Sequence, residues 1–398
     1  MNPTLWAILA GCLFLTACNP KGSDGQVSPE NDSLGFRTGA EVLADHDFDL
    51  LRGRRVGLIT NHTAVVDSVH LIDRMHAHPD VDLVALFGPE HGLRGLDEAG
   101  DRVTDGIDEA TGLPVYSLYG QSRQPPDSVL AGIDVLVFDI QDIGARFYTY
   151  ISTMGLAMQS AARAGIVFVV LDRPNPLGRR VEGPVREPDA ESFVGLYPIQ
   201  ITHGMTVGEL AREIKEQGWL DGLESLKLEV VEVINWDHRN LWPETGRPWI
   251  PTSPNIPDFE TALVYPGICL FEGTIWSEGR GTRRPFRVVG YPGIDGQRMA
   301  DSLNAIGLPG VRFRSVTFTP MSIAGMASNP KHEGVPLSGV RLEVTNYSSY
   351  EPVRTGIAVV RAAYWATPAE ARADFFNERW FDLLAGSSSI RESLVATQ

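Results

Sequence analysis

Hydrophobic residues occur along the chain in short continuous runs, and stretches with helical spacing lie between them. A run of about four to eight apolar residues is typical of a strand that is buried on both faces of a sheet. Strands that alternate with helices indicate βαβ units and predict a mostly parallel sheet. The predicted strands are 54–60, 81–87, 133–140 and 166–171, and the predicted helices are 69–76 and 150–164.

A second group of elements begins near residue 206. Thr206, followed three residues later by Glu209, has the pattern of a capping box at the start of a helix. The elements that follow this helix are a strand over 226–233, helices over 296–306 and 356–366, and strands over 311–318 and 340–344. Because the last two strands indicate a smaller sheet, we predict an α/β protein with a domain boundary near residue 262.

Each strand of the first group is followed by a cluster of polar, glycine or proline residues. Parallel strands place their carboxyl ends at one edge of a sheet, so we expect the clusters to face one crevice. The connection over 93–128 is long and polar, which is typical of a functional loop. The clusters are 60–63, 88–92, 139–148 and 172–178.

Composition and charge narrow the possible functions. The chain has 398 residues, of which 43% are hydrophobic and 21% charged, so it can bury a large core. Its net charge of -16 argues against a nucleic-acid partner, because phosphate binding needs a basic surface. The sequence has no dinucleotide fingerprint after the first strand, and no phosphate-binding loop, HExxH or GxSxG motif.

The N-terminus has the pattern of a targeting segment. Residues 5–15 are almost entirely apolar, and Leu15-Thr16-Ala17-Cys18 resembles the bacterial lipobox, although residues 1–17 contain no Lys or Arg. We therefore predict a signal peptide over 1–17 and a flexible tether over 18–35 that is lipidated at Cys18. An ordinary signal peptide or an uncleaved anchor is the alternative.

This pattern predicts a periplasmic lipoprotein anchored in a membrane, and Asn19 favours the outer membrane. Cys12 lies in the removable segment and Cys18 is the predicted lipid site, so only Cys269 remains and no disulfide can form within the mature fold. We expect Cys269 to be a buried core residue.

The predicted crevice contains acids, imidazoles, amides and hydroxyls. This mixture suits the cleavage of acetals by an acid and a second group, and it also suits metal-assisted hydrolysis. The residues alone do not select between the two. Glu90 and His91 can equally form a loop salt bridge, and Asp139 can cap a helix. Among the tryptophans, Trp276 is the best candidate for stacking on a sugar.

Taken together, five motifs resemble the exo-β-N-acetylmuramidase family of bacterial cell-wall recycling, of the NamZ type. The resemblance implies a Rossmann-like catalytic domain over 36–262 and a smaller α/β domain over 263–398 that closes the cleft. It also implies release of N-acetylmuramic acid (MurNAc) from the non-reducing end of peptidoglycan fragments such as MurNAc-GlcNAc, without a cofactor or metal. The motifs are 57–63, 87–92, 139–150, 171–178, and 272–274 with 277–282.

The resemblance places the catalytic acid at Glu90. His91, Asp139 and Glu182 are the further catalytic candidates, and Glu278, Tyr148 or an N-acetyl-assisted route are alternatives for the second group. The resemblance does not decide whether the configuration at the anomeric carbon is retained or inverted. The residues expected to bind substrate are Asn61, His62, Gln141, Arg146, Tyr148, Tyr150, Asp172, Asn175, Glu278 and Arg280.

Two other functions stay open on the sequence. One is a lipoprotein that binds muropeptides without cleaving them, and the other is a metal-dependent hydrolase that uses His62, His91 and Asp139. The expected partners are a peptidoglycan-derived disaccharide or muropeptide, and a membrane through the lipid at Cys18. No nucleic-acid partner is expected, and the oligomeric state is left open.

Overall fold

The computed structural model describes residues 35–90, 92–93, 105–120 and 122–396. The predicted signal peptide, most of the tether, the lipidation site Cys18 and the catalytic candidate His91 lie outside these residues. Residues 36–398 form one compact unit. No helix in the described ranges combines the length and the apolar character needed to cross a membrane.

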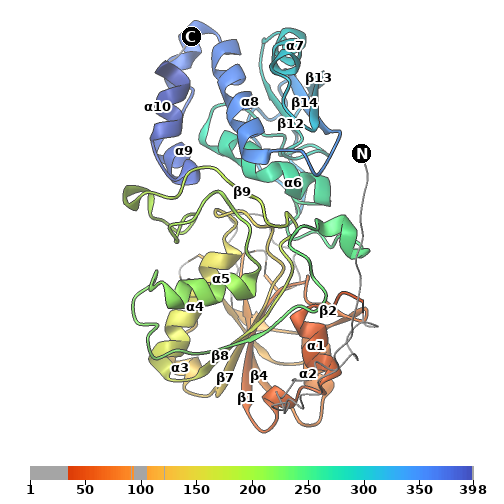
Figure 1. The fold of residues 1–398 in the computed structure, drawn as a ribbon, viewed down its shortest axis with the longest axis vertical. Coiled ribbons are helices and arrows are strands. Elements are labelled where there is room, and N and C mark those ends of the chain that lie inside the picture. Colours follow the sequence, from red (N-terminus) through yellow and green to blue (C-terminus); the bar gives the residue numbers. More distant parts are fainter. Residues whose placement is uncertain (1–34, 91, 94–104, 121, 397–398) are drawn as a thin grey trace, which may run out of the picture. The chain divides into compact units, whose positions relative to one another are not determined.

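A large, mostly parallel sheet lies in the N-terminal part of this unit, as the alternation of strands and helices predicts (Figure 1). Its described strands have the order β11-β8-β7-β1-β4-β6-β5, and β5 is antiparallel to its neighbour. Leu58 is paired with Leu86 on one side and with Val137 on the other. The strands are β1 (Arg55–Thr60), β4 (Asp82–Gly88), β5 (Gly106–Ile107), β6 (Pro114–Ser117), β7 (Val135–Asp139), β8 (Val167–Leu171) and β11 (Lys227–Val231).

Alternate side chains of the central strands enter two different cores, because successive strand residues point to opposite faces. Leu58 and Val137 pack on the face that also buries residues of α1 and α2. Ile59 and Phe138 pack on the opposite face with α3, α4 and α5. Both faces are therefore covered, which explains the continuous apolar runs. The helices are α1 (Gly39–Asp45), α2 (Leu71–Ala77), α3 (Asp127–Leu130), α4 (Tyr150–Ala164) and α5 (Val207–Glu216).

Two predictions in this part need correction. The connection over 93–128 contains β5, β6 and the start of α3 in its described residues, and β6 extends the sheet beside β4. The helix predicted from residue 69 begins at Leu71, because Val66 and Val69 belong to a small hairpin of β2 (Val65–Val66) and β3 (Val69–His70). The ring of His70 caps that helix by accepting from the amide of Ile72 at 3.2 Å.

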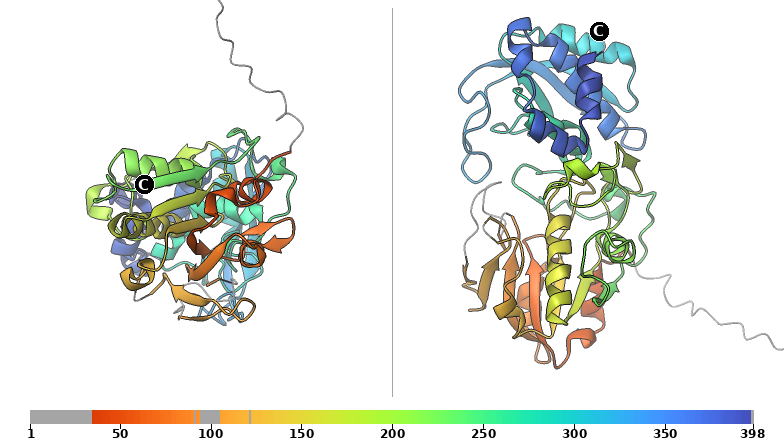
Figure 2. Two further views of the ribbon diagram at one scale, coloured as in Figure 1. Left: turned by 90° about the horizontal axis from the view of Figure 1, so that it is seen from below. Right: turned by 90° about the vertical axis from the view of Figure 1, so that its left-hand side faces the viewer.

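The C-terminal elements build a smaller antiparallel sheet with helices packed around it (Figure 2). The strand order β12-β14-β13 confirms the predicted second sheet and adds a strand to it. The strands are β12 (Val288–Tyr291), β13 (Val311–Phe318) and β14 (Leu337–Val344), and the helices are α6 (Phe259–Ile268), α7 (Gly296–Ile306), α8 (Pro352–Ala366), α9 (Glu378–Ala385) and α10 (Ser389–Ala396).

Short elements connect these two groups. An antiparallel pair is formed by β9 (Val181–Glu182) and β10 (Thr202–His203). The boundary expected near residue 262 falls inside α6, so its position stays a prediction. The 3₁₀ helices of the described chain are η2 (Asp49–Leu51), η3 (Pro188–Ala190), η4 (Trp242–Thr245), η5 (Cys269–Gly273) and η6 (Ala369–Asp374).

Helices α6 and α8 cross in backbone contact. Gly267 of α6 and Gly356 of α8 meet at the crossing, and a Cβ built on Gly356 would lie 2.3 Å from the Cα of Gly267. Atoms cannot approach that closely, and a backbone atom moves only if the helix moves. The crossing therefore requires the absence of a side chain, in agreement with the use of small residues where backbones approach closely.

We predict that Gly356→Ala lowers the free energy of unfolding by about 1–3 kcal/mol, because overpacking at the crossing outweighs the better helix propensity of alanine. Urea unfolding followed by circular dichroism measures the change. The matched control is Gly106→Ala, where an added Cβ has no neighbour within 4 Å. An equal or greater stability of Gly356→Ala would contradict the close crossing.

Candidate functional site

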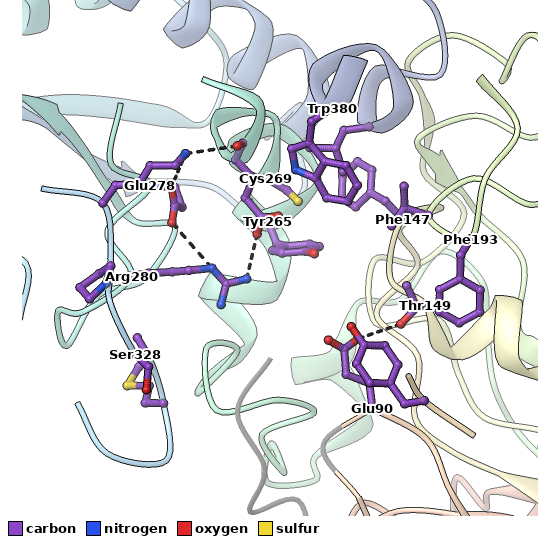
Figure 3. Close-up of a pocket in the computed structure, with 18 of the residues that line it drawn as sticks. Glu90, Phe147, Thr149, Phe193, Tyr265, Cys269, Glu278, Arg280, Ser328 and Trp380 are labelled. Carbon is purple, nitrogen blue, oxygen red and sulfur yellow. Dashed lines mark hydrogen bonds and ion pairs between the residues drawn. The ribbon is translucent and has the colours of Figure 1, made fainter. Parts of the chain in front are cut away.

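A cavity of about 810 Å³ lies between the elements that follow the large sheet and the C-terminal elements. Figure 3 shows Glu90, Thr149 and Phe193 on one side and Glu278 and Arg280 on the other. Its lining includes Glu90, Tyr119, Arg123, Phe147, Thr149 and Phe193 from the first group and Tyr265, Cys269, Glu272, Glu278, Arg280, Lys331 and Trp380 from the second.

Glu90 is placed in this cavity by the turn that ends β4. The strand stops at Gly88, and Pro89 leads the chain directly to the half-buried carboxylate. The hydroxyl of Thr149 donates to Glu90 Oε2 at 2.9 Å, and the side chain of Tyr119 is also hydrogen-bonded to Glu90. Burial raises the pKa of Tyr119, and the charge of Glu90 raises it further. Both neighbours therefore keep their hydroxyl protons and orient the carboxylate.

The opposite wall carries two carboxylates and two cations. The guanidinium of Arg280 lies 2.8 Å from Glu272 and 3.7 Å from Glu278. The ammonium of Lys331 lies 3.1 Å from Glu278, which is 3% exposed. Burial alone would lower the pKa of Arg280, but Glu272 and Glu278 raise it above its ordinary value. The two negative and two positive side chains have no net charge, and their pairing reduces the free-energy cost of removing them from water.

Aromatic rings supply the apolar surface of the cavity. Phe147, Phe193, Tyr265 and Trp380 line it, and such rings are suited to the apolar faces of sugars. The expectation that Trp276 stacks on substrate is wrong, because this side chain is fully buried and donates to Thr367 Oγ1 at 2.8 Å.

Cys269 is buried in the core as predicted, with 1% exposure. It also contributes to the cavity wall. Burial raises the pKa of its thiol well above the ordinary value, so the thiol stays protonated and unreactive.

Tyr148 and Tyr150 lie in a smaller pocket of about 50 Å³ that shares Glu90 and Arg280 with the main cavity. The two hydroxyls donate to Thr252, one to its side chain and one to its carbonyl oxygen, each at 2.8 Å. Burial raises the pKa of both phenols, so they are donors rather than nucleophiles at neutral pH. These tyrosines fix the segment around Thr252 beside Glu90.

The polar clusters at the carboxyl edge of the sheet are brought together, as the parallel topology predicts. The amide of Gln141 donates to Thr63 Oγ1 at 3.1 Å, and its side chain donates to the carbonyl of Pro174 at 2.9 Å. Asn61 accepts from the amide and hydroxyl of Thr63 at 3.0 and 2.6 Å. These side chains therefore join three loops to one another.

His62 and Asn175 have similar contacts. His62 Nε2 lies 2.5 Å from the carbonyl oxygen of Pro251. Asn175 donates to the carbonyl of Met205 at 3.0 Å and accepts from the amide of Leu177 at 2.9 Å. Neither residue lines the cavity, and neither do Asn61 and Gln141. Asn and Asp side chains commonly stabilise turns in this way.

Asp139 is fully buried in an ion pair and does not line the cavity. Its two oxygens accept from Arg173 at 2.5 and 2.9 Å. In the ranges that the structure describes, no three His, Cys, Asp or Glu side chains lie close enough together to hold a metal ion. Of the proposed metal ligands, His91 lies outside those ranges.

Arg146 is a fully buried cation that connects the two groups of elements. Its guanidinium donates to the carbonyls of Pro184, Ile199 and Leu384 at 3.0, 2.8 and 2.9 Å. Burial, together with the nearby charge of Arg186, lowers its pKa to about 10, so it stays charged at neutral pH. Leu384 lies in the last turn of α9, where a cation interacts favourably with the helix dipole.

Glu182, a catalytic candidate from the sequence, lies outside the cavity at the start of α8. It accepts from the amides of Val353 and Arg354 at 3.0 and 3.4 Å, which are among the helix amides without an intrahelical partner. Burial raises the pKa of Glu182. The structure therefore places this carboxylate as a helix cap.

Asp172 has the same kind of position at α5. One oxygen accepts from the amides of Gly208 and Arg173 at 2.7 and 2.8 Å, and the other accepts from the hydroxyl of Thr206 at 2.9 Å. Burial raises the pKa of Asp172 to about 6 in spite of these hydrogen bonds. The predicted capping box of Thr206 and Glu209 is confirmed beside it.

The sequence reasoning missed several cavity residues. Tyr119 and Arg123 belong to the connection over 93–128 that was expected to be functional, but nothing singled them out within it. Glu272 belongs to the motif over 272–274 and 277–282, but the sequence assigned no role to it. Nothing in the sequence pointed to Phe193, Lys331 or Trp380, because their positions depend on how distant segments pack.

We predict that lowering the pH stabilises the wild-type protein relative to Asp172→Asn. The folded protein holds the Asp172 proton more tightly than the unfolded chain does, so ionisation of Asp172 costs stability above about pH 6 and this cost disappears as the pH falls toward 4. The gain amounts to about 3 kcal/mol at most, for a pKa difference of about two units. The side chain of the variant Asp172→Asn keeps an oxygen that accepts from the amides of Gly208 and Arg173.

Urea unfolding of both proteins at several pH values measures the difference between their free energies of unfolding. A difference that does not change with pH would contradict the raised pKa of Asp172.

Comparison with known proteins gives consistent matches over the chain. A family model described as exo-β-N-acetylmuramidase NamZ, N-terminal, matches residues 56–260, and its C-terminal counterpart matches residues 263–398. The chain is 42% identical over 397 residues to the peptidoglycan β-N-acetylmuramidase NamZ of Bacillus subtilis (strain 168), covering 99% of this chain and 93% of that protein.

Two crystal structures of DUF1343 family proteins from Bacteroides fragilis NCTC 9343 resemble this fold. One is 40% identical with a TM-score of 0.81, covering 90% of each chain. The other is 33% identical with a TM-score of 0.74, covering 91% of each chain. Matches to both halves, a curated relative above 40% identity and the shared fold lead to one conclusion: this chain belongs to the exo-β-N-acetylmuramidase NamZ family.

Proposed function

We propose that this protein is an exo-acting glycosidase that releases MurNAc from the non-reducing end of peptidoglycan fragments of the MurNAc-GlcNAc type. The observation that carries the proposal is the half-buried carboxylate of Glu90 on the wall of a cavity large enough for a disaccharide. The family membership of the chain supports the same reaction and substrate.

Glu90 acts as the general acid in this proposal. Cleavage of a glycosidic bond requires a proton on the leaving oxygen, because an alkoxide is a poor leaving group. Thr149 and Tyr119 are neutral hydroxyl groups that hold the carboxyl in one orientation. A fixed orientation toward the cavity allows the proton to be delivered to a bound glycosidic oxygen.

The opposite wall holds the two other carboxylates among the described lining residues, Glu272 and Glu278, in a cluster without net charge. As the bond breaks, positive charge develops at the anomeric carbon and ring oxygen of MurNAc. Arg280 and Lys331 balance Glu272 and Glu278, so this wall gives no net negative charge to the developing cation and serves to position the sugar. Asp139 and Glu182 have no part in this account, since neither lines the cavity.

We predict that Glu90→Gln lowers the rate of MurNAc-GlcNAc hydrolysis by about 10²–10⁴-fold, the usual contribution of a general acid. The loss should be smaller on 4-nitrophenyl β-MurNAc, because nitrophenolate leaves without a proton. Initial rates on both substrates measure this difference, with thermal unfolding as a check on folding.

The matched control is Glu229→Gln, an exposed carboxylate on β11. It should keep wild-type rates on both substrates. A folded Glu90→Gln variant with full disaccharide activity would remove Glu90 from the mechanism. A wild-type protein that binds MurNAc-GlcNAc but releases no product would favour the non-catalytic alternative.

The proposal extends to location. We infer that the mature protein is a periplasmic lipoprotein that acylated Cys18 holds in a membrane. Asn19, the residue after Cys18, favours the outer membrane. The support is the apolar run over 5–15 followed by Leu15-Thr16-Ala17-Cys18, and the polar segment after it. An anchored enzyme in the periplasm would meet fragments of the cell wall.

We predict that Cys18→Ser moves the protein from the membrane fraction to the soluble periplasmic fraction, because the acyl chains can no longer be attached. Fractionation of cells that express each form, with metabolic labelling by a fatty acid, measures this. Cys269→Ser is the control and should leave the distribution unchanged, since that thiol is buried. Equal labelling of the Cys18→Ser protein would contradict lipidation at this residue.

A further inference from the structure

We propose that Arg123 is a specificity-determining residue that binds the lactyl carboxylate of MurNAc. The inference rests on the proposed function, and it names the group that distinguishes this sugar from its close relative. MurNAc differs from GlcNAc by a lactyl ether at C3, which carries a negative charge at neutral pH. A site that selects MurNAc therefore needs a cation that is available to this carboxylate.

The charges of the cavity identify Arg123 as that cation. Among the residues that the structure describes, the basic side chains that line the cavity are Arg123, Arg280 and Lys331. The last two are held by Glu272 and Glu278 on the opposite wall, so their charge is already balanced. Over the described ranges of the chain, no ion pair joins Arg123 to a carboxylate. Its charge is thus available to a bound anion.

Arg123 is also oriented for this contact. Its guanidinium carbon lies 4.1 Å from the centre of the Phe193 ring, in a cation–π arrangement. The backbone of Phe193 is fixed in turn, because its carbonyl accepts from the hydroxyl of Ser152 at 2.7 Å, and Ser152 is fully buried in α4. The planar guanidinium carries its N–H donors in a fixed fork, which suits a carboxylate with two acceptor oxygens.

Arg123 lies on the same side of the cavity as the proposed acid Glu90. Tyr119, four residues before Arg123, is hydrogen-bonded to Glu90, so Arg123 and Glu90 belong to the same side of the cavity. A sugar that presents its anomeric oxygen to Glu90 carries its C3 substituent at another corner of the ring. The net charge of -16 makes a local cation more important, because the protein as a whole repels an anionic sugar.

The test measures binding without turnover. Isothermal titration calorimetry compares free MurNAc with its lactyl N-methylamide, which has the same sugar but no charge, for wild type, Arg123→Gln and Arg123→Lys. We expect wild type to bind MurNAc about 10- to 100-fold more tightly than the amide, the usual effect of a charge-assisted hydrogen bond. Arg123→Gln should lose this difference, and Arg123→Lys should keep part of it.

The matched control is Arg312→Gln, an exposed arginine on β13 that does not line the cavity. It should bind both ligands as wild type does. Equal binding of MurNAc and its amide by wild type, no binding of either, or an Arg123→Gln variant that keeps the difference would overturn the inference. Binding selectivity without hydrolysis of MurNAc-GlcNAc would instead contradict the proposed function and leave the role of Arg123 standing.

Discussion

The parallel pairing of β7, β1 and β4 is the constraint on which the site depends. Register between these strands brings their carboxyl ends to one edge of the sheet, so segments that are far apart in sequence continue from neighbouring points. The tight turn after β4 then sends Glu90 into the cavity, while the longer segment after β7 reaches Thr149, which bonds to Glu90. A change in register would separate the acid from the residue that orients it.

Most polar residues at this edge hold the scaffold rather than the cavity wall. Gln141 joins two loops, Asp172 and Glu182 cap helices, and Arg146 binds three carbonyls from distant segments. Buried polar groups need partners, and each of these finds them in backbone groups that would otherwise be unpaired. The few polar side chains that face the cavity can therefore be held in place by a rigid surround.

The sequence predicted the layout well because the signals for it are local. Helix α4 has the predicted bounds of 150–164, and the edge clusters meet as the topology requires. The sequence could not show which cluster residues line the cavity and which stabilise the scaffold, because Asn and Asp side chains can stabilise turns, cap helices or bind ligands. Asp139 shows the difficulty, because its partner Arg173 comes from the segment that follows β8. Trp276 was expected to contact the sugar, but Trp380 lines the cavity instead. The position of Trp380 depends on how α9 packs, which the sequence does not show.

In the proposed reaction, the cavity around Glu90 cleaves the bond between a terminal MurNAc and the next sugar. This reaction is tested most directly by incubating the protein with MurNAc-GlcNAc and, separately, with GlcNAc-MurNAc, and identifying the products by mass spectrometry. We expect free MurNAc and GlcNAc from the first disaccharide and no cleavage of the second. Failure to release monosaccharides from MurNAc-GlcNAc, or equal cleavage of both disaccharides, would contradict it.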